Sequence, residues 1–386
     1  MILFLHNRYR TTGGEERVVE DLLALVREQL GEPAELMQRD STSLGRARAA
    51  VGLIGGGLDP GAVGHAVQTS GARVLHAHNL HPAFGWRALA AARAAGARVV
   101  LHLHQYRLVC AVGVCYTDGA ECTRCHGRNT LPGLRRNCRG SSAESAAYAV
   151  SLALWQRRMV QQADAVIVPS LFARERLREL GAPLDWERVH VLAPPVAAAG
   201  GVAVGVGGQG GPDREPGGPC PVGNGGRYAL VAARLSREKG VDVAIEACRI
   251  VGMPLVVAGD GPEWGTLQER VGGADVRFLG RVDAASLARW RSQATIALVP
   301  SRSAETFGLA AAEAMAAGVP VAASSVGALP ELVDRSGLVP PGDAQALAAA
   351  IARLGSDEGA GARGADRVRS LCAPEVVARA LAAIYA

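Results

Sequence analysis

Two carboxylates in the second half of the sequence are spaced so that they can face one cleft. Glu305 precedes the stretch Thr306–Ala317, which we predict to be an alanine-rich helix because Gly318 and Pro320 follow it. Glu313 lies eight residues after Glu305, and eight helical steps return to within about 80° of the same face. The free N–H groups of a helix start bind anions. The alternative is that Glu305 only complements the helix dipole.

Two cations precede this acidic pair in the chain. Arg234 and Lys239 follow a predicted strand, Tyr228–Ala232, and a Gly259–Pro262 turn follows the next strand, Pro254–Ala258. Lys239 is the only lysine in an arginine-rich chain, which favours a role for a compact ammonium group, with chance survival as the alternative. In doubly wound sheets, ligands bind at the carboxyl ends of the strands. Cations, flexible glycines and helix N–H groups at that edge predict a diphosphate site.

Polar side chains also follow two predicted strands of the first half, at residues 73–76 and 97–102. They are His76, His78, Asn79, His102, His104, Gln105 and Tyr106. A single buried histidine is usually structural, but several at two successive strand ends favour binding, with His78 and His104 as the main candidates.

Residues 107–140 form a cysteine-rich insertion. Four of its cysteines predict a closed structural zinc site: Cys110, Cys122, Cys125 and Cys138. Two residues separate Cys122 from Cys125, as in a zinc knuckle. Cys115 and His126 are further candidate ligands, and free buried thiols or a redox pair are the alternatives.

Length and composition favour two α/β domains without nucleic-acid binding. The 386 residues carry a net charge of +5 with no long basic run. We find no signal peptide and no stretch long enough to span a bilayer, so we expect a cytoplasmic protein. The apolar stretch Ala143–Leu154, followed by Trp155 and two arginines, predicts a half-buried helix. Peripheral membrane contact is its alternative.

A break at residues 196–227 divides two series of alternating strands and helices. Its Gly- and Pro-rich composition predicts a flexible linker. We therefore expect an N-terminal domain at 1–195, a C-terminal domain at 228–372, and a final helix at 373–386 that could pack back on the N-terminal domain. A Gly13-Gly14 turn after the first strand could approach a phosphate. The dinucleotide fingerprint of a dehydrogenase is missing from both halves.

Four motifs of the C-terminal half together resemble a known family. They are Arg234–Gly240, Gly259–Pro262, Phe278–Val282 and Pro300–Gly318. In order and spacing they resemble the family-4 retaining glycosyltransferases of group 1. The N-terminal half adds Gly13-Gly14-Glu-Glu, His78-Asn79 and His104–Cys110 with its cysteine insertion, as in a bacterial subset. The resemblance implies the α/β fold called GT-B, with two Rossmann-like doubly wound domains facing a central cleft.

The resemblance also implies roles for individual residues. Arg234 and Lys239 would stabilise the leaving nucleotide diphosphate, Glu305 would bind the transferred sugar, and His104 would contact that sugar from the N-terminal domain. The implied donor-binding residues are Gly13, Gly14, Gly259, Gly261, Arg281, Val282, Thr306, Phe307, Gly308, Leu309 and Glu313, with Glu313 on the ribose and Arg281-Val282 on the base. The acceptor-binding candidates are His78, Asn79 and Tyr106. Gln105 departs from the family, where many relatives carry Asp or Asn.

The resulting hypothesis is a retaining glycosyltransferase that uses a UDP- or GDP-sugar, with UDP favoured, and needs no catalytic metal. Its acceptor would be a hydroxyl of a small molecule, a saccharide or a lipid-linked sugar, in polysaccharide or specialised metabolism. Two alternatives remain: a nucleotide-sugar epimerase or glycosyl phosphorylase on the same fold, and a non-catalytic sugar-nucleotide-binding scaffold.

Overall fold

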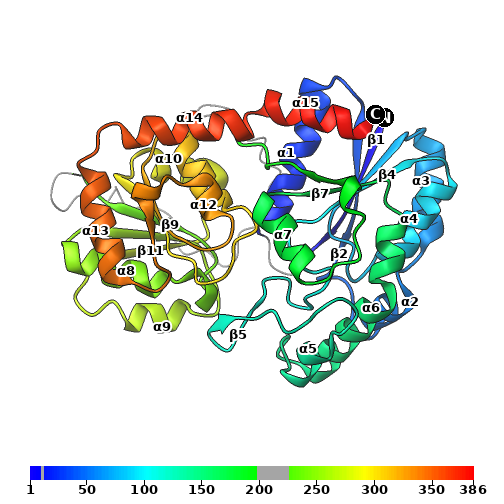
Figure 1. Ribbon diagram of the computed structural model, residues 1–386, viewed down its shortest axis with the longest axis horizontal. Helices are drawn as coiled ribbons and strands as arrows, with labels where there is room; N and C mark the ends of the chain where they lie inside the picture. Colours follow the sequence, from blue (N-terminus) through cyan, green and yellow to red (C-terminus); the bar gives the residue numbers. More distant parts are fainter. Residues whose placement is uncertain (10–12, 198–225) are drawn as a thin grey trace. The chain divides into compact units, whose positions relative to one another are not determined.

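The computed structural model describes residues 1–9, 13–197 and 226–386. Within it the chain forms two units, one from residues 1–195 with 374–386 and the other from residues 196–373. Unit 1 and unit 2 are used below for these two parts (Figure 1). Most of the predicted linker, 198–225, lies outside the described residues.

Unit 1 contains a six-stranded sheet in the order β2-β1-β3-β4-β7-β8, and every strand pair in it is parallel. The strands are β1 (Ile2–Arg8), β2 (Ala34–Asp40), β3 (Val74–Ala77), β4 (Arg98–His102), β7 (Ala165–Val168) and β8 (Val189–Val191). Chain order reverses between β1 and β3. In a doubly wound sheet this reversal marks the edge where ligands bind.

Helices cover this sheet, and a small hairpin belongs to the cysteine insertion. The helices are α1 (Gly14–Gln29), α2 (Arg46–Gly55), α3 (Pro60–Ser70), α4 (Gly85–Ala94), α5 (Leu131–Arg135), α6 (Ser142–Gln161), α7 (Leu171–Glu179) and α15 (Pro374–Tyr385); the hairpin is β5 (Tyr116–Thr117) and β6 (Ala120–Glu121). Among the described residues, no helix is both long and apolar enough to cross a bilayer.

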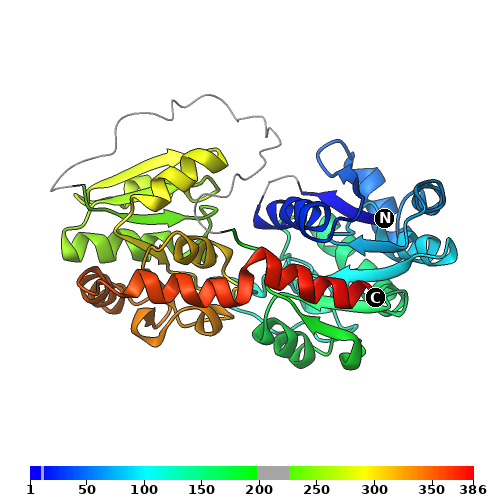
Figure 2. The same cartoon turned by 90° about the horizontal axis from the view of Figure 1, so that it is seen from above.

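The last helix, α15, belongs to unit 1 although it follows unit 2 in the chain (Figures 1 and 2). It packs on α1 and β4, with Leu381 and Tyr385 fully buried. Arg73 donates from Nη1 to the Tyr385 carbonyl at 3.0 Å, and Arg98 donates from Nε to the Ile384 carbonyl at 3.1 Å. These two cations satisfy carbonyls that the helix end leaves without a partner.

Unit 2 repeats the architecture with the strand order β11-β10-β9-β12-β13-β14. The strands are β9 (Ala229–Ala232), β10 (Leu255–Ala258), β11 (Val276–Gly280), β12 (Ile296–Val299), β13 (Val321–Ser324) and β14 (Leu338–Val339), all paired in parallel. Here chain order reverses between β9 and β12. The loops after these two strands carry Lys239 and Glu305, which places both at the ligand-binding edge.

The helices of unit 2 are α8 (Val241–Val251), α9 (Trp264–Glu269), α10 (Ala284–Ser292), α11 (Leu309–Ala316), α12 (Leu329–Leu332), α13 (Ala344–Gly355) and α14 (Ala360–Cys372). The prediction that a helix begins at Thr306 is wrong, because α11 begins at Leu309. Gly308 caps it with φ 99°, a left-handed conformation outside the helical region. The helix therefore starts one turn later than its sequence pattern suggests.

Candidate functional site

Lys239 and Glu305 form the centre of the candidate site in unit 2. The Lys239 ammonium donates to Glu305 Oε1 at 2.7 Å, and Ser301 donates from its hydroxyl to the same oxygen at 2.6 Å. Burial opposes ionisation of Glu305, but the Lys239 charge and the two hydrogen bonds hold the pKa of that carboxyl below its usual value. Two residues separated by 66 positions thus make one ion pair at the β9–β12 reversal.

Arg234 lies on the same strand-end loop as Lys239 and pairs with Glu238. Ser236 donates to the same Glu238 carboxylate oxygen at 2.6 Å. Although burial opposes ionisation, these contacts hold the pKa of Glu238 below its usual value. The Arg234 side chain remains half exposed, so Glu238 orients the guanidinium without covering it. Sequence reasoning missed Glu238.

Glu313 has a different cationic partner from Glu305. On α11 it pairs with Arg291 of α10, and both side chains are largely buried, at 11% and 8% exposed. Glu305 and Glu313 are thus each held by their own cation, and a cleft shared by the two carboxylates stays a prediction. Sequence reasoning missed Arg291. Helix α10 carries both Arg289 and Arg291, and nothing in its sequence shows that Arg291 is the one that is buried.

Glycines let the loops after β9 and β10 approach each other closely. A Cβ added to Gly259, at φ 144°, would lie 1.9 Å from the Ala233 carbonyl oxygen, and one added to Gly261 would lie 2.3 Å from that of Leu235. The Leu235 N–H donates to the Asp260 carbonyl at 2.9 Å. The Gly259–Pro262 turn is thus joined to the loop that carries Arg234 and Lys239.

The other predicted donor-binding residues of unit 2 lie on the loops that follow β11 and β12. Thr306 and Phe307 lie between Glu305 and the start of α11 at Leu309, with Phe307 buried and Thr306 half-buried. Arg281 and Val282 directly follow β11, and Arg281 is exposed. Gly308 is packed against Leu329, where an added Cβ would come within 2.6 Å of Cδ2. Helix α11 begins at Leu309, four residues after Glu305, which pairs with Lys239.

In unit 1, four imidazoles form a two-layer array at the ends of β3 and β4. His76 Nε2 meets His102 Nδ1 at 3.2 Å with ring planes only 7° from parallel, and His78 Nδ1 meets His104 Nε2 at 2.8 Å. His76 stacks on His78 with ring centroids 4.4 Å apart, and His102 stacks on His104 at 4.2 Å. The structure therefore brings the predicted residues His78 and His104 together.

Burial keeps this imidazole array neutral. It lowers the pKa of all four rings, and that of His76 falls to about 3. The hydroxyl of Tyr385, from α15, contacts His76 Nδ1 at 2.7 Å. For His104, the charge of Glu15 partly opposes the effect of burial. A neutral imidazole donates from one ring nitrogen and accepts at the other, and the Nε2 of His104 is already engaged with His78.

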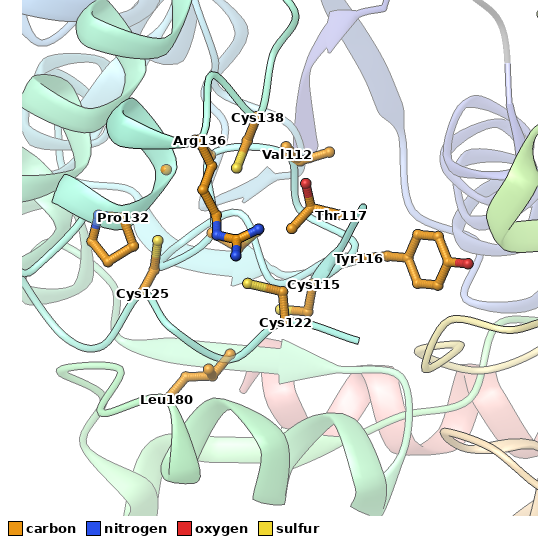
Figure 3. Close-up of a pocket in the computed structure, with 13 residues that line it drawn as sticks. Val112, Cys115, Tyr116, Thr117, Cys122, Cys125, Pro132, Arg136, Cys138 and Leu180 are labelled. Atoms are coloured by element: carbon orange, nitrogen blue, oxygen red, sulfur yellow. The ribbon is translucent and has the colours of Figure 1, made fainter. Parts of the chain in front are cut away.

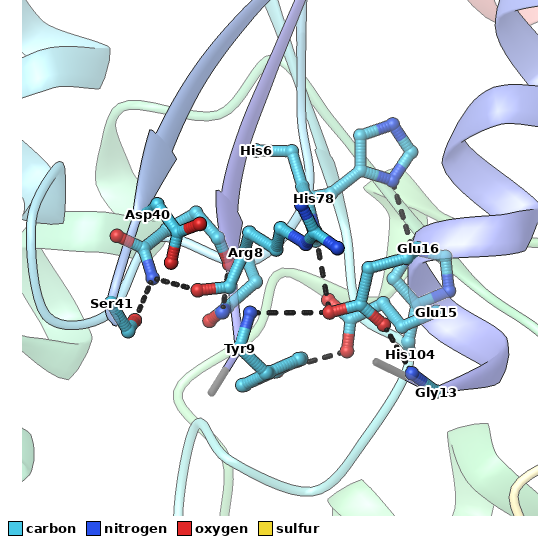
Figure 4. A network of polar contacts seen from close by, with 12 residues as sticks. His6, Arg8, Tyr9, Gly13, Glu15, Glu16, Asp40, Ser41, His78 and His104 are labelled. Carbon is cyan, nitrogen blue, oxygen red and sulfur yellow. Dashed lines mark hydrogen bonds and ion pairs between the residues drawn. The ribbon is translucent and has the colours of Figure 1, made fainter. Parts of the chain in front are cut away.

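Gly13 and Gly14 open helix α1 beside a network of carboxylates (Figure 4). The Gly13 N–H donates to Glu16 Oε2 at 2.8 Å, and the Tyr9 N–H donates to Glu16 Oε1 at 3.1 Å. Gln105 donates from Nε2 to Glu15 Oε2 at 2.8 Å. The Gly13 N–H is thus already engaged in this structure. An aspartate in place of Gln105 would set a carboxylate against Glu15, so the departure at Gln105 matches its surroundings.

All three predicted acceptor-binding residues, His78, Asn79 and Tyr106, have buried side chains. Asn79 donates from Nδ2 to the Asn7 carbonyl at 2.6 Å, and its side-chain oxygen accepts from the His81 N–H at 3.3 Å. Tyr106 is in the hydrophobic core of unit 1. Direct contact of either side chain with an acceptor would require these surroundings to move, and it stays a prediction.

The five cysteines of the insertion line one pocket (Figure 3). Its volume, about 20 Å³, fits a single ion or water. A hydrogen bond from the Cys115 thiol lowers the pKa of Cys110 to about 6. In the described part of the chain, three potential metal ligands have atoms within 4.8 Å of one another, and these are His76, His78 and His102 rather than cysteines. The predicted zinc ligands therefore share a pocket but are spread more widely than ligands on one ion.

Family models match both halves of the chain. The model for glycosyl transferases group 1 matches residues 226–357, and that for the glycosyl transferase 4-like domain matches residues 9–195. The chain belongs to the family-4 glycosyltransferases, and its fold is GT-B.

Similar curated proteins share part of the sequence. The amylovoran biosynthesis glycosyltransferase AmsK of Erwinia amylovora is 38% identical over 146 residues, which cover 33% of this chain and 36% of that protein. The D-inositol 3-phosphate glycosyltransferase of Jonesia denitrificans is 34% identical over 204 residues, covering 48% of this chain and 47% of that protein. The matches thus span less than half the length of these relatives.

Solved structures share the fold over nearly the full chain. Sucrose-phosphate synthase from Thermosynechococcus elongatus superposes with a TM-score of 0.69 at 21% identity, covering 100% of this chain and 98% of the other. The Anabaena protein HepE in complex with UDP gives 0.61 at 19% identity, covering 99% and 98%. At these identities the likeness concerns the fold alone.

Proposed function

We propose that this protein is a retaining glycosyltransferase that moves a sugar from a nucleotide-diphosphate donor to an acceptor hydroxyl. The observation that carries the proposal is the Lys239–Glu305 ion pair at the β9–β12 reversal of unit 2. Arg234 lies on the same loop as Lys239, and the first turn of α11 follows Glu305. Cations and N–H groups suit a diphosphate, and a carboxylate suits sugar hydroxyls.

Charge develops on the leaving diphosphate as the bond to the sugar breaks. Lys239 and Arg234 would stabilise that charge, because donors held in place before the reaction need no reorganisation during it. Glu238 and Glu305 hold the two cations in position. Glu305 can accept hydrogen bonds from the sugar once the diphosphate attracts Lys239. No protein nucleophile and no catalytic metal enter this scheme.

Glu313 would bind the ribose of the nucleotide, with Arg291 fixing the direction of its carboxylate. A uridine donor is favoured, in keeping with the UDP and UDP-glucose complexes described for Anabaena HepE. In unit 1, His104, His78 and the Gly13–Gly14 turn would contribute the remaining contacts. A cytoplasmic location belongs to the same proposal, since the seven described cysteines are free thiols.

Replacement of Lys239 by alanine tests this assignment. We expect Lys239→Ala to lose about 2–4 kcal/mol of transition-state stabilisation in kcat/KM, because one positioned donor to the leaving group is removed. The assay uses a panel of sugar nucleotides with hydroxyl acceptors, and NMR of the product reports whether the anomeric configuration is retained.

Arg237→Ala is the matched control, since Arg237 is a cation of the same loop that is largely exposed and pairs with Glu263. It should leave kcat/KM nearly unchanged. Equal activity of Lys239→Ala and the parent would overturn the site. An inverted product would overturn retention, and turnover without acceptor or with free phosphate would indicate an epimerase or a phosphorylase. Nucleotide binding without turnover on any acceptor would indicate a scaffold.

A further inference from the structure

Helices α2 and α6 of unit 1 expose large apolar side chains in regular stripes. On α2, Val51 is 63% exposed and Ile54 is 50% exposed; on α6, Val150 is 43% and Leu154 is 44% exposed. Single exposed apolar residues are ordinary in soluble proteins. Here the spacings of three and four residues place each pair on one face of its helix. The exposure is therefore a property of two helix faces.

The two helices lie side by side. Leu53 of α2 shares a buried cluster with Tyr148 and Leu152 of α6. Trp155 of α6 donates from Nε1 to the Ile54 carbonyl at 2.9 Å. This hydrogen bond joins the helices at the residues next to the exposed Ile54 and Leu154, so the two stripes are neighbours.

Positive charge flanks the stripes. Arg46 and Arg48 lie in the first turn of α2, which contains no acidic residue. Arg157 and Arg158 lie in the second half of α6, whose one acidic residue, Glu144, pairs with Arg139 at 3.4 Å. The Arg158 guanidinium lies over the Trp155 ring, 5.1 Å from its centroid. The helices thus combine apolar centres with cationic and aromatic borders.

We propose that this α2–α6 surface docks on an anionic phospholipid bilayer. It comprises Val51, Ile54, Val150 and Leu154 with Arg46, Arg48, Arg157 and Arg158. Apolar side chains enter the boundary between headgroups and acyl chains, and arginines at the same level attract anionic headgroups. A nucleic acid would offer the apolar stripes nothing to bind, whereas a bilayer accommodates both features. The proposal concerns a partner and does not depend on sugar transfer.

Vesicle co-sedimentation of the full chain tests the proposal. We expect binding to vesicles of phosphatidylglycerol and phosphatidylcholine in equal parts, and much weaker binding to phosphatidylcholine alone. High salt should weaken the binding because it screens the headgroup charge. Arg46→Gln with Arg157→Gln should lower the partition coefficient about fivefold per arginine removed. Ile54→Gln with Leu154→Gln should lower it further.

Leu171→Gln is the control, since Leu171 is a leucine on α7, outside the α2–α6 surface, that is more exposed than Ile54 or Leu154. It should bind vesicles like the parent, and all variants should keep the parent's circular dichroism spectrum. Equal binding to both vesicle types, or equal loss with Leu171→Gln, would overturn the proposal. A sedimentation coefficient that the Ile54 and Leu154 changes reduce in the absence of vesicles would assign the surface to a second copy of the chain instead.

Discussion

At the scale of single residues, the imidazole array of unit 1 has an energetic consequence. Three of its rings are buried and that of His104 is half-buried, and burial lowers the pKa of all four because it penalises the charged form of histidine. His76 contacts His102 and the Tyr385 hydroxyl, so a proton added there would place a charge beside a neutral imidazole and a phenol. Folding should therefore oppose protonation of the array.

The free energy of unfolding should fall as the pH is lowered from about 6.5 towards 3. The pKa of His76 is about 3 in the folded protein and about 6.5 when unfolded, so the unfolded chain binds protons more readily in this window. Each such histidine contributes a slope of about 1.4 kcal/mol per pH unit. Urea unfolding at a series of pH values measures it.

His65, an exposed histidine of α3, supplies the control for this slope. His65→Gln should leave the slope of the free energy of unfolding against pH unchanged. His76→Gln should reduce that slope by up to the amount that corresponds to one bound proton. A slope that is identical in the parent and in His76→Gln would show that the array does not resist protonation.

The sequence indicated several candidate site residues but not all of the side chains that hold them. Lys239 stood out as the single lysine, and Glu305 by its place before a helix. Glu238 and Arg291 gave no comparable signal, because their importance comes from burial next to Arg234 and Glu313. Burial of one charged residue in an otherwise polar loop or helix depends on tertiary packing, which a residue pattern does not contain.

At the scale of elements, periodic segments were predicted well and irregular ones were not. The strands at residues 74–77 and 229–232 follow apolar runs that sequence reasoning found. Helices α2 and α3 lie within residues 43–71, a Gly-rich stretch for which no secondary structure was predicted above, and Asp59 caps α3 by accepting from the Ala62 N–H. The start of α11 was misplaced because the left-handed conformation of Gly308 outweighs the favourable composition of Thr306–Ala317.

The five cysteines of the insertion line one small pocket, and we expect four of them to move together around one zinc ion per chain. Metal analysis of the purified protein should find zinc. Cys125→Ser should abolish the zinc content, because thiolates select zinc and four close the site. A chelator should lower the unfolding temperature of the parent, because a zinc ion that binds only the folded insertion stabilises the folded state.

Cys248→Ser is the control for that experiment, since Cys248 is a buried cysteine of unit 2 outside the pocket. It should retain the full zinc content. Zinc far below one ion per chain in the parent, together with five reactive thiols in the insertion, would exclude a zinc site and favour free thiols.

At the scale of the whole molecule, α15 contributes to the stability of unit 1, although the residues that precede it in the chain form unit 2. We expect Leu381→Ala, a fully buried leucine of α15, to cost about 2–5 kcal/mol through the cavity it leaves. Hydrogen exchange should accelerate in β1, β3 and β4 of unit 1, with little change in β9 and β10 of unit 2. Exchange that accelerates equally in both units would contradict this expectation.

Leu371→Ala provides the comparison, because Leu371 is an exposed leucine near the end of α14, ten residues earlier in the chain. That substitution removes the same atoms without leaving a buried cavity, so exchange in unit 1 should match that of the parent.

Because unit 1 contains both residues 1–195 and residues 374–386, it is completed last during synthesis. A ribosome makes residues 1–195, then all of unit 2, and only afterwards the segment that becomes α15. Until that segment leaves the exit tunnel, α1 and β4 lack their covering helix, and Tyr385 cannot reach His76. Unit 2, which is made from one continuous stretch, can finish folding before the part of the protein that was begun first.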